Sequence, residues 1–392
     1  MRRSFLYRCL LGMLCVSQPI AMTRVFSLCI PQPPELKDSS ETRSLDLSEK
    51  LERIRSQFEF PGMVCGKLTK QGGMSIGVCG IAKEGDSAPL EKNSLLHLGS
   101  CTKSMTATLV AIYVEQGKLR WDSSLQSLFP DIPGFQTTSW GNVTLDDLME
   151  HTAGLPANAP WGNWAQAKDL VKARHEIATW VTTRPWEEKK HGKFEYSNLG
   201  YMLLGHAIEQ IEKKPWEEIV QEKLFSPLGI ESAGFGSPVQ RKDYPVSWGH
   251  VRTDDGKGWV PVEQDNPAVL GPAGTAHATM EDWCKYLRIH LQSPDDANFP
   301  LPIGKENWNR LHQSQKETEY AGGWHTGKRD WANGQILTHN GSNTMWYCVV
   351  FLAPDRGMGV FAAANVGLEA SPVCDRALQL VLREEGLLAN ER

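Results

Sequence analysis

The sequence of 392 residues lacks several patterns that would assign it to a functional class at once. It has no Cys-x-x-Cys pair and no His-Glu-x-x-His motif, so we expect no metal ion and no other cofactor. A net charge of −5 argues against binding to nucleic acid, which usually needs a basic surface. No apolar run approaches the roughly 20 residues that span a bilayer, so we expect no transmembrane segment.

The remaining composition is that of an ordinary globular protein. Hydrophobic residues make up 41% and charged residues 22% of the chain. This length fits one large domain or two closely packed ones. Neither composition nor length indicates an oligomeric state.

Residues 1–28 have the pattern of an export signal. Two arginines near the start precede a short apolar run over 9–16. The stretch Arg-Arg-Ser-Phe-Leu also resembles a twin-arginine signal, which implies a bacterial source. Residues 29–45 are rich in proline, serine and charge, which is typical of a linker. We therefore expect an exported protein, periplasmic or extracellular.

Periodicity of apolar residues predicts the main helices and strands. Residues 118–270 give little strand signal and are predicted to be helix and loop. Cys65 and Cys79 fall on neighbouring predicted strands, and the sequence leaves open whether they pair or remain free thiols. The predicted helices are 47–58, one that starts at Ser100, 198–211, 281–291 and 371–385; the predicted strands are 62–69, 74–81, 335–338, 345–351 and 357–363.

These elements predict a mixed α/β fold of the α+β type. Two early and three late strands indicate an antiparallel sheet of five or more strands, flanked by helices and built from both ends of the chain. We expect residues 46–98 and 275–392 to form this sheet domain and residues 99–274 to form a mostly helical domain. An active site is expected between the two.

The most informative motif is Ser100-Cys101-Thr102-Lys103, at the head of an apolar helical run. Positions i and i+3 share one face of a helix, so the Lys103 amine can lie against the Ser100 hydroxyl. Serine is a poor nucleophile without a base beside it, and this spacing supplies one. An alternative reading makes Ser100 only a helix N-cap.

Two further motifs follow in order, Tyr196-Ser197-Asn198 and His339-Asn340-Gly341. Together the three resemble the serine β-lactamase and penicillin-binding-protein-like family: class C β-lactamases, D-alanyl-D-alanine carboxypeptidases and related esterases. The resemblance runs from about Phe60 to about Asn365. Other stretches that resemble this family are 143–156, 225–230, 271–275 and 320–324.

The resemblance implies a role for each motif residue. Ser100 is expected to be the nucleophile, and Lys103 and Tyr196 to transfer protons, with the principal base left open. The backbone N–H groups of Ser100 and Ser342 are expected to bind the developing oxyanion. Other roles follow for the remaining motif positions: Asn198 contacts Lys103 or the substrate, His339 contacts the substrate, and Gly341 lets its strand approach the substrate closely.

His339 and Asn340 depart from the class C pattern, which has Lys and Thr at these positions. Histidine titrates near neutral pH, whereas lysine remains a cation, so we expect weaker anchoring of a penicillin-like carboxylate. His151, in His-Thr-Ala-Gly-Leu-Pro, is interpreted as a structural residue.

The sequence therefore predicts a serine hydrolase that acts through an acyl-enzyme on an ester or amide bond. Its expected partner is a small-molecule or peptide substrate, of the D,D-peptidase or esterase kind. Two alternatives stay open: a true β-lactamase, and a penicillin-binding module that is acylated without turnover.

Overall fold

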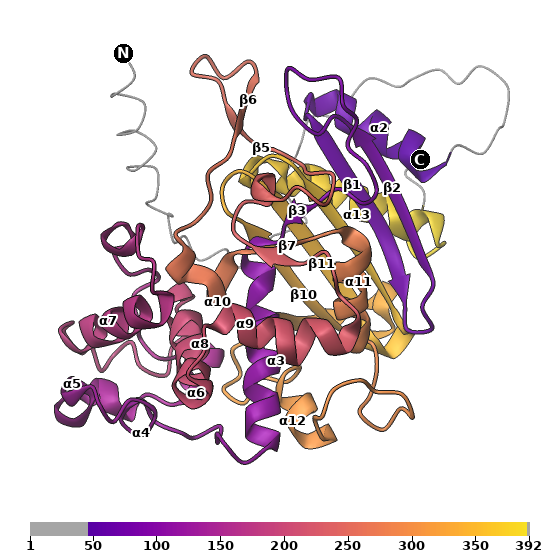
Figure 1. The fold of residues 1–392 in the computed structure, drawn as a ribbon. Helices are drawn as coiled ribbons and strands as arrows, with labels where there is room; N and C mark the ends of the chain where they lie inside the picture. Colours follow the sequence, from indigo (N-terminus) through magenta and orange to yellow (C-terminus); the bar gives the residue numbers. More distant parts are fainter. Residues whose placement is uncertain (1–45, 390–392) are drawn as a thin grey trace, which may run out of the picture. The chain divides into compact units, whose positions relative to one another are not determined.

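The computed structural model describes residues 46–389 (Figure 1). Most of its helices and strands lie where the apolar periodicity of the sequence predicts them. The predicted export signal and linker, residues 1–45, lie outside the described residues. No helix within 46–389 has both the length and the hydrophobicity needed to cross a membrane.

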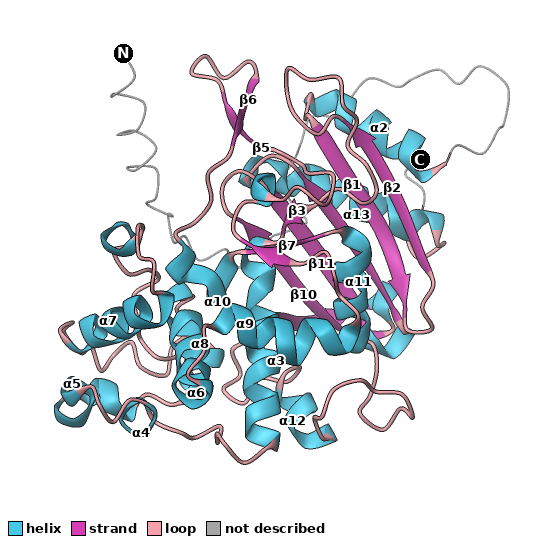
Figure 2. Ribbon diagram, viewed as in Figure 1, coloured by secondary structure: helices cyan, strands magenta, loops and turns pink. Residues whose placement is uncertain are grey.

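A seven-stranded antiparallel sheet organises the fold (Figure 2). Its strand order is β2-β1-β12-β11-β10-β9-β8, so strands from both ends of the chain meet at the β1–β12 pair. The predicted mixed fold with a sheet of five or more strands is confirmed. The strands are β1 (Gly62–Thr69), β2 (Met74–Gly80), β8 (Tyr320–Ala321), β9 (Trp324–Arg329), β10 (Gly334–Ser342), β11 (Tyr347–Ala353) and β12 (Met358–Ala364).

Helices cover both faces of this sheet. On one face lie α2 (Leu47–Phe58) and α13 (Ser371–Glu384), whose apolar side chains pack with Val360 and Ala362 of β12. On the other face, Trp283 of α11 (Met280–Ile289) contacts Phe361 edge-on. Alternation along each strand therefore sends side chains into two separate apolar layers.

The central helix α3 (Thr102–Glu115) is buried from Thr102 to Tyr113. Its sequence is apolar on nearly every side, and the predicted buried central helix is confirmed. The other helices are α4 (Leu125–Leu128), α5 (Pro133–Thr137), α6 (Leu145–Met149), α7 (Leu170–Thr182), α8 (Asn198–Glu212), α9 (Trp216–Val220), α10 (Gly271–Gly274) and α12 (Lys305–Arg310).

Short strands within residues 118–270 correct the expectation of helix and loop alone. β5 (Gly249–Arg252) and β6 (Trp259–Val262) form a hairpin. β4 (Gly234–Phe235) pairs with β7 (Ala276–Ala278), which also pairs with β3 (Leu96–His97). Segments of two to four residues are too short to show a period of two.

The cysteines of residues 46–389 are all free thiols. Cys79 lies opposite Met63, and Cys65 lies opposite Gly77, so the two cysteines are offset along the β1–β2 pair. Of the two options that the sequence left open, the structure has the free thiols. Burial raises the pKa of Cys79 to about 12, which leaves this thiol unreactive at neutral pH.

A buried arginine fixes the loop that leads into α10. Arg174 is fully buried and pairs with Glu209 and Glu217, each at 2.5 Å. Its Nε donates to the carbonyl of Val269 and its Nη2 to that of Ala268, both at 3.0 Å. A buried guanidinium needs this many partners to offset its lost hydration. The network holds the chain just before Ala273, which belongs to the candidate site.

Candidate active site

Ser100 lies in a 3₁₀ turn, Gly99–Cys101, that leads directly into α3. The residue is partly exposed, whereas Cys101 is buried. Gly99 has a φ of +48°, and a Cβ there would lie 2.3 Å from the Ser342 nitrogen. Glycine therefore allows the turn to touch the end of β10.

Lys103 is fully buried one helical turn after Ser100. Its Nζ lies 3.2 Å from the Ser100 Oγ. It also donates to the Asn198 Oδ1 and to the Ala273 carbonyl, each at 2.7 Å. The first motif thus brings a hydroxyl and an amine into direct contact, as the spacing predicts.

The second motif lies at the start of α8. The Lys103 Nζ is 4.8 Å from the centroid of the Tyr196 ring. Ser197 is the N-cap of α8, since its hydroxyl accepts the Gly200 N–H at 3.1 Å. The Asn198 side chain is thereby left to bind Lys103, and its Nδ2 donates to the Asn158 Oδ1 at 2.9 Å. The helix cap is therefore Ser197 and not its neighbour Asn198.

The third motif lies on β10, where alternate residues face opposite sides of the sheet. Gly341 lies against the turn of Ser100: a Cβ on it would be 1.9 Å from the Leu98 carbonyl oxygen and 2.9 Å from the Ser100 nitrogen. The Asn340 side chain contacts the Tyr347 hydroxyl at 3.3 Å, away from Ser100. Asn340 therefore takes no part in the cluster around Ser100.

His339 is buried beside Tyr196, with ring centroids 6.3 Å apart. Its Nδ1 donates to the Asn340 carbonyl at 2.5 Å, and its Nε2 accepts the Tyr320 hydroxyl at 3.1 Å. Burial lowers the pKa of His339 well below its ordinary value, and the nearby His325 and Lys103 add to this. The expectation that it titrates near neutral pH is wrong, because desolvation keeps the ring neutral.

The sequence interpretation gave His151 only a structural role, and it missed how close this residue lies to Tyr196. The two ring centroids are 4.4 Å apart. The His151 Nδ1 accepts the Ser197 N–H at 3.1 Å, and its buried Nε2 has no hydrogen-bond partner among residues 46–389. Burial lowers the pKa of His151 well below its usual range, with Lys103 the next largest cause. No spacing signal could have found this contact, since it depends on tertiary packing.

The cluster around Ser100 brings together a hydroxyl, an amine, a phenol and imidazole rings. Within residues 46–389 no group of three or more His, Cys, Asp or Glu could hold a metal ion.

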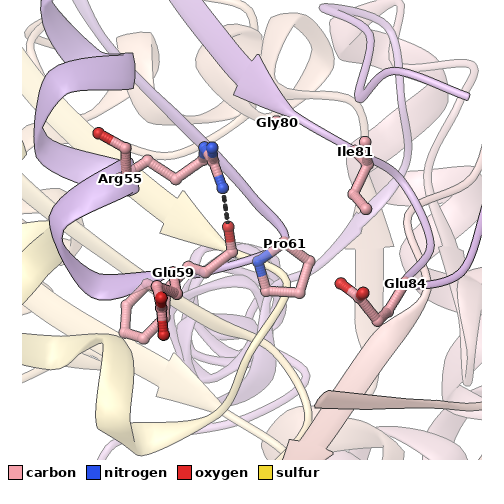
Figure 3. Close-up of a pocket in the computed structure, with 8 residues that line it drawn as sticks. Arg55, Glu59, Pro61, Gly80, Ile81 and Glu84 are labelled. Atoms are coloured by element: carbon pink, nitrogen blue, oxygen red, sulfur yellow. Dashed lines mark hydrogen bonds between the residues drawn. The ribbon is translucent and has the colours of Figure 1, made fainter. Parts of the chain in front are cut away.

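A separate surface hollow near the ends of β1 and β2 contains no motif residue. Its Arg55 already binds Glu52 and the Phe60 carbonyl (Figure 3). Its labelled lining residues are Arg55, Glu59, Pro61, Gly80, Ile81 and Glu84.

Comparison with known proteins assigns the chain to a family. The family model described as "Beta-lactamase" matches residues 52–383. The chain belongs to the beta-lactamase family. Members of this family are serine hydrolases, and the predicted resemblance is confirmed.

Three of the proteins that this beta-lactamase family member matches share 22 or 23% sequence identity with it. An "Unguisins hydrolase ungD'" of Aspergillus campestris is 22% identical over 84% of this chain, which spans 63% of that protein's length. A "Penicillin-binding protein 4" of Amycolatopsis lactamdurans is 23% identical over 85% of this chain and 88% of its own length. The crystal structure of SurE with D-Leu has a TM-score of 0.70 at 23% identity, covering 88% of this chain and 76% of SurE. That structural likeness shows a shared fold.

The contact at Gly341 can be tested by substitution. Gly341→Ala places a methyl group against the Leu98 carbonyl, so β10 must withdraw from the Ser100 turn. We expect the rate at which a fluorophosphonate labels Ser100 to fall about 100-fold or more, the usual effect of losing one oxyanion donor. Gly162→Ala, with nothing within 4 Å of its Cβ, is the matched control. Labelling at the wild-type rate in Gly341→Ala would show that the close approach is not needed.

Three histidines with lowered pKa values predict a loss of stability in acid. His325 has a pKa lowered to about 4 by burial, and the pKa values of His151 and His339 are also lowered. Below pH 6.5 these histidines become protonated in the unfolded chain but remain neutral in the folded chain. The free energy of unfolding therefore decreases as pH falls. Each such histidine contributes about 1.4 kcal/mol per pH unit between its two pKa values.

Urea unfolding at pH 7.5, 6.0 and 5.0 measures this slope. The variant His325→Phe keeps the ring contact with Tyr320. We expect its free energy of unfolding to depend less steeply on pH than that of the wild type, by the contribution of one histidine. An identical slope in the variant and the wild type would contradict the assignment.

Proposed function

We propose that this protein is a serine hydrolase that forms an acyl-enzyme on Ser100 and cleaves an ester or amide bond. The observation that supports this most directly is the contact between the buried Lys103 amine and the Ser100 hydroxyl. As an ammonium, Lys103 donates to the oxygens of Ser100, Asn198 and Ala273. As a neutral amine it donates to the Asn198 and Ala273 carbonyls and accepts the Ser100 proton. The second arrangement is that of a general base.

In the proposed reaction, the Ser100 Oγ attacks the substrate carbonyl while its proton passes to Lys103 or Tyr196. The N–H groups of Ser100 and Ser342 then stabilise the tetrahedral oxyanion. The leaving group departs with the proton, which gives the acyl-enzyme. Water attacks this ester with proton transfer through the same pair, and Ser100 is released.

The neutral His339 favours a D-peptide or ester substrate over a β-lactam. Both of its nitrogens are bound within the protein, and its pKa is held low by burial. A carboxylate next to His339 therefore finds no cation on this side chain. This is the reason to prefer carboxypeptidase or esterase activity over β-lactamase activity, which remains the alternative.

The Ser100→Ala variant tests the proposal on a substrate panel of p-nitrophenyl esters, D-alanyl-D-alanine peptides and nitrocefin. We expect the wild type to turn over an ester or D-peptide, and Ser100→Ala to lose more than about a thousandfold in kcat/KM. Ser127→Ala, a change to a serine outside the cluster, is the control. Near-wild-type turnover by Ser100→Ala would remove Ser100 from the mechanism. Stoichiometric labelling by a fluorescent penicillin without turnover would favour the binding module.

We further propose export through the segment 1–28, on the basis of its arginine pair and apolar run. Export predicts that the mature protein accumulates outside the cytoplasm with a new N-terminus. N-terminal sequencing of the fractionated protein measures this, and an intact Met1 in a cytoplasmic protein would contradict it.

A further inference from the structure

A hydrogen-bonded network joins the two segments that carry the proposed oxyanion donors. Asp265 lies at its centre, with a side chain that is only 7% exposed. Its Oδ2 is 2.9 Å from the His97 Nε2, and its Oδ1 accepts the Asn343 Nδ2 at 2.7 Å. His97 precedes the turn of Ser100, and Asn343 follows Ser342.

The first branch fixes the Gly99 amide. The Gly99 N–H donates to the His97 Nδ1 at 3.0 Å, so this nitrogen carries no proton. The hydrogen of the neutral ring is therefore on Nε2 and is donated to Asp265. In this way the Asp265 carboxylate selects the tautomer that can hold the backbone one residue before Ser100.

The second branch fixes the turn after β10. The Asn343 Oδ1 accepts the N–H groups of Met345 and Trp346 at 3.2 and 3.1 Å. Its Nδ2 is left to bind Asp265, which sets the orientation of the amide. Asn343 is buried, so few other partners can replace this contact. The Ser342 N–H lies directly before this clamped residue.

A third contact reaches the neighbourhood of Lys103. The backbone N–H of Asn266, next in sequence, donates to the Asp265 Oδ1 at 2.6 Å. The Asn266 side chain donates to the Gly274 carbonyl at 3.3 Å. Gly274 follows Ala273, whose carbonyl accepts from Lys103. The loop of Asp265 thus borders all three parts of the proposed reaction centre.

We propose that Asp265 is a positioning residue that sets the spacing of the two oxyanion N–H groups by holding His97 and Asn343 at once. This proposal rests on the proposed acyl-enzyme at Ser100. Asp265 is not expected to touch the substrate, and its effect is on the rate of acylation rather than on substrate binding. Displacing an oxyanion N–H donor slows the reaction less than removing it. We therefore expect a smaller loss of rate than the removal of one donor would cause.

The central experiment measures kcat and KM for p-nitrophenyl ester hydrolysis by Asp265→Asn. The amide that replaces the Asp265 carboxylate has only one acceptor oxygen, so it cannot accept from both His97 and Asn343. Its NH2 group then faces the N–H of one of these two residues. We expect kcat/KM to fall about 10- to 100-fold, mostly in kcat, with KM near the wild-type value. Asp282→Asn is the matched control, because Asp282 is a buried carboxylate that binds the Glu231 and Ser232 N–H groups.

Two further variants separate positioning from folding. In the exchange Asp265→Asn with Asn343→Asp, the new amide donates to the new carboxylate and still accepts from His97; only the acceptor for the Asn266 N–H is lost. We expect this exchange variant to recover kcat to within about fivefold of the wild type. Asn343→Ser keeps an acceptor for the turn and loses only the link to Asp265, so it tests the proposal if Asp265→Asn does not fold.

The outcomes are distinct. Suppose first that the wild type is active. An unchanged kcat in Asp265→Asn or in Asn343→Ser then overturns the role of Asp265 and leaves the proposed function intact. An exchange variant whose kcat is no higher than that of Asp265→Asn does the same. An equal loss in Asp282→Asn also overturns it, because the effect is then a general one of stability. A wild type that turns over neither an ester nor a D-peptide of the panel overturns the proposed function, and the role of Asp265 with it.

Discussion

The candidate site depends on one close approach between two glycine-bearing segments. The turn before Ser100 and the end of β10 meet where a Cβ on Gly99 would lie 2.3 Å from the Ser342 nitrogen. A Cβ on Gly341 would lie 1.9 Å from the Leu98 carbonyl oxygen. No other residue type permits this contact without moving the backbone. The antiparallel sheet supplies the β10 side of the contact, so the position of β10 between β9 and β11 decides where Ser342 lies relative to Ser100.

A second constraint is the buried amine of Lys103. A buried ammonium or amine needs oxygen partners to offset its desolvation, and Lys103 has partners in the 3₁₀ turn before α3, in α8 and in α10. The α10 partner is itself held in place through the loop that Arg174 anchors. The helical part of the fold therefore orients the Lys103 amine, while the sheet orients the opposite side of the site.

The sequence predicts local elements well and tertiary contacts poorly. The predicted bounds of α2 and β1 are those observed. In α2 the apolar residues recur on one face, whereas β1 is a short run that is buried for most of its length and ends at a hairpin turn. The i, i+3 spacing also correctly predicted the contact between Ser100 and Lys103. His151 and Asp265 could not be assigned, since their contacts come from segments far apart in the chain. The titration of His339 was misjudged for the same reason: its pKa is set by burial, which the sequence does not show.

The environment of His339 also bears on substrate choice. An imidazole that donates to Asn340 and accepts from Tyr320 has no free N–H to offer a substrate. Phe194 is 41% exposed, and its ring lies 5.8 Å from Tyr320 and 5.7 Å from His151. The exposed side of this cluster is thus aromatic, next to the partly exposed Tyr196. An apolar group on the substrate gains contact area there, whereas a carboxylate loses hydration without gaining a cation from His339. For the proposed hydrolase, this edge of the site therefore offers a substrate apolar contact rather than an ion pair with His339.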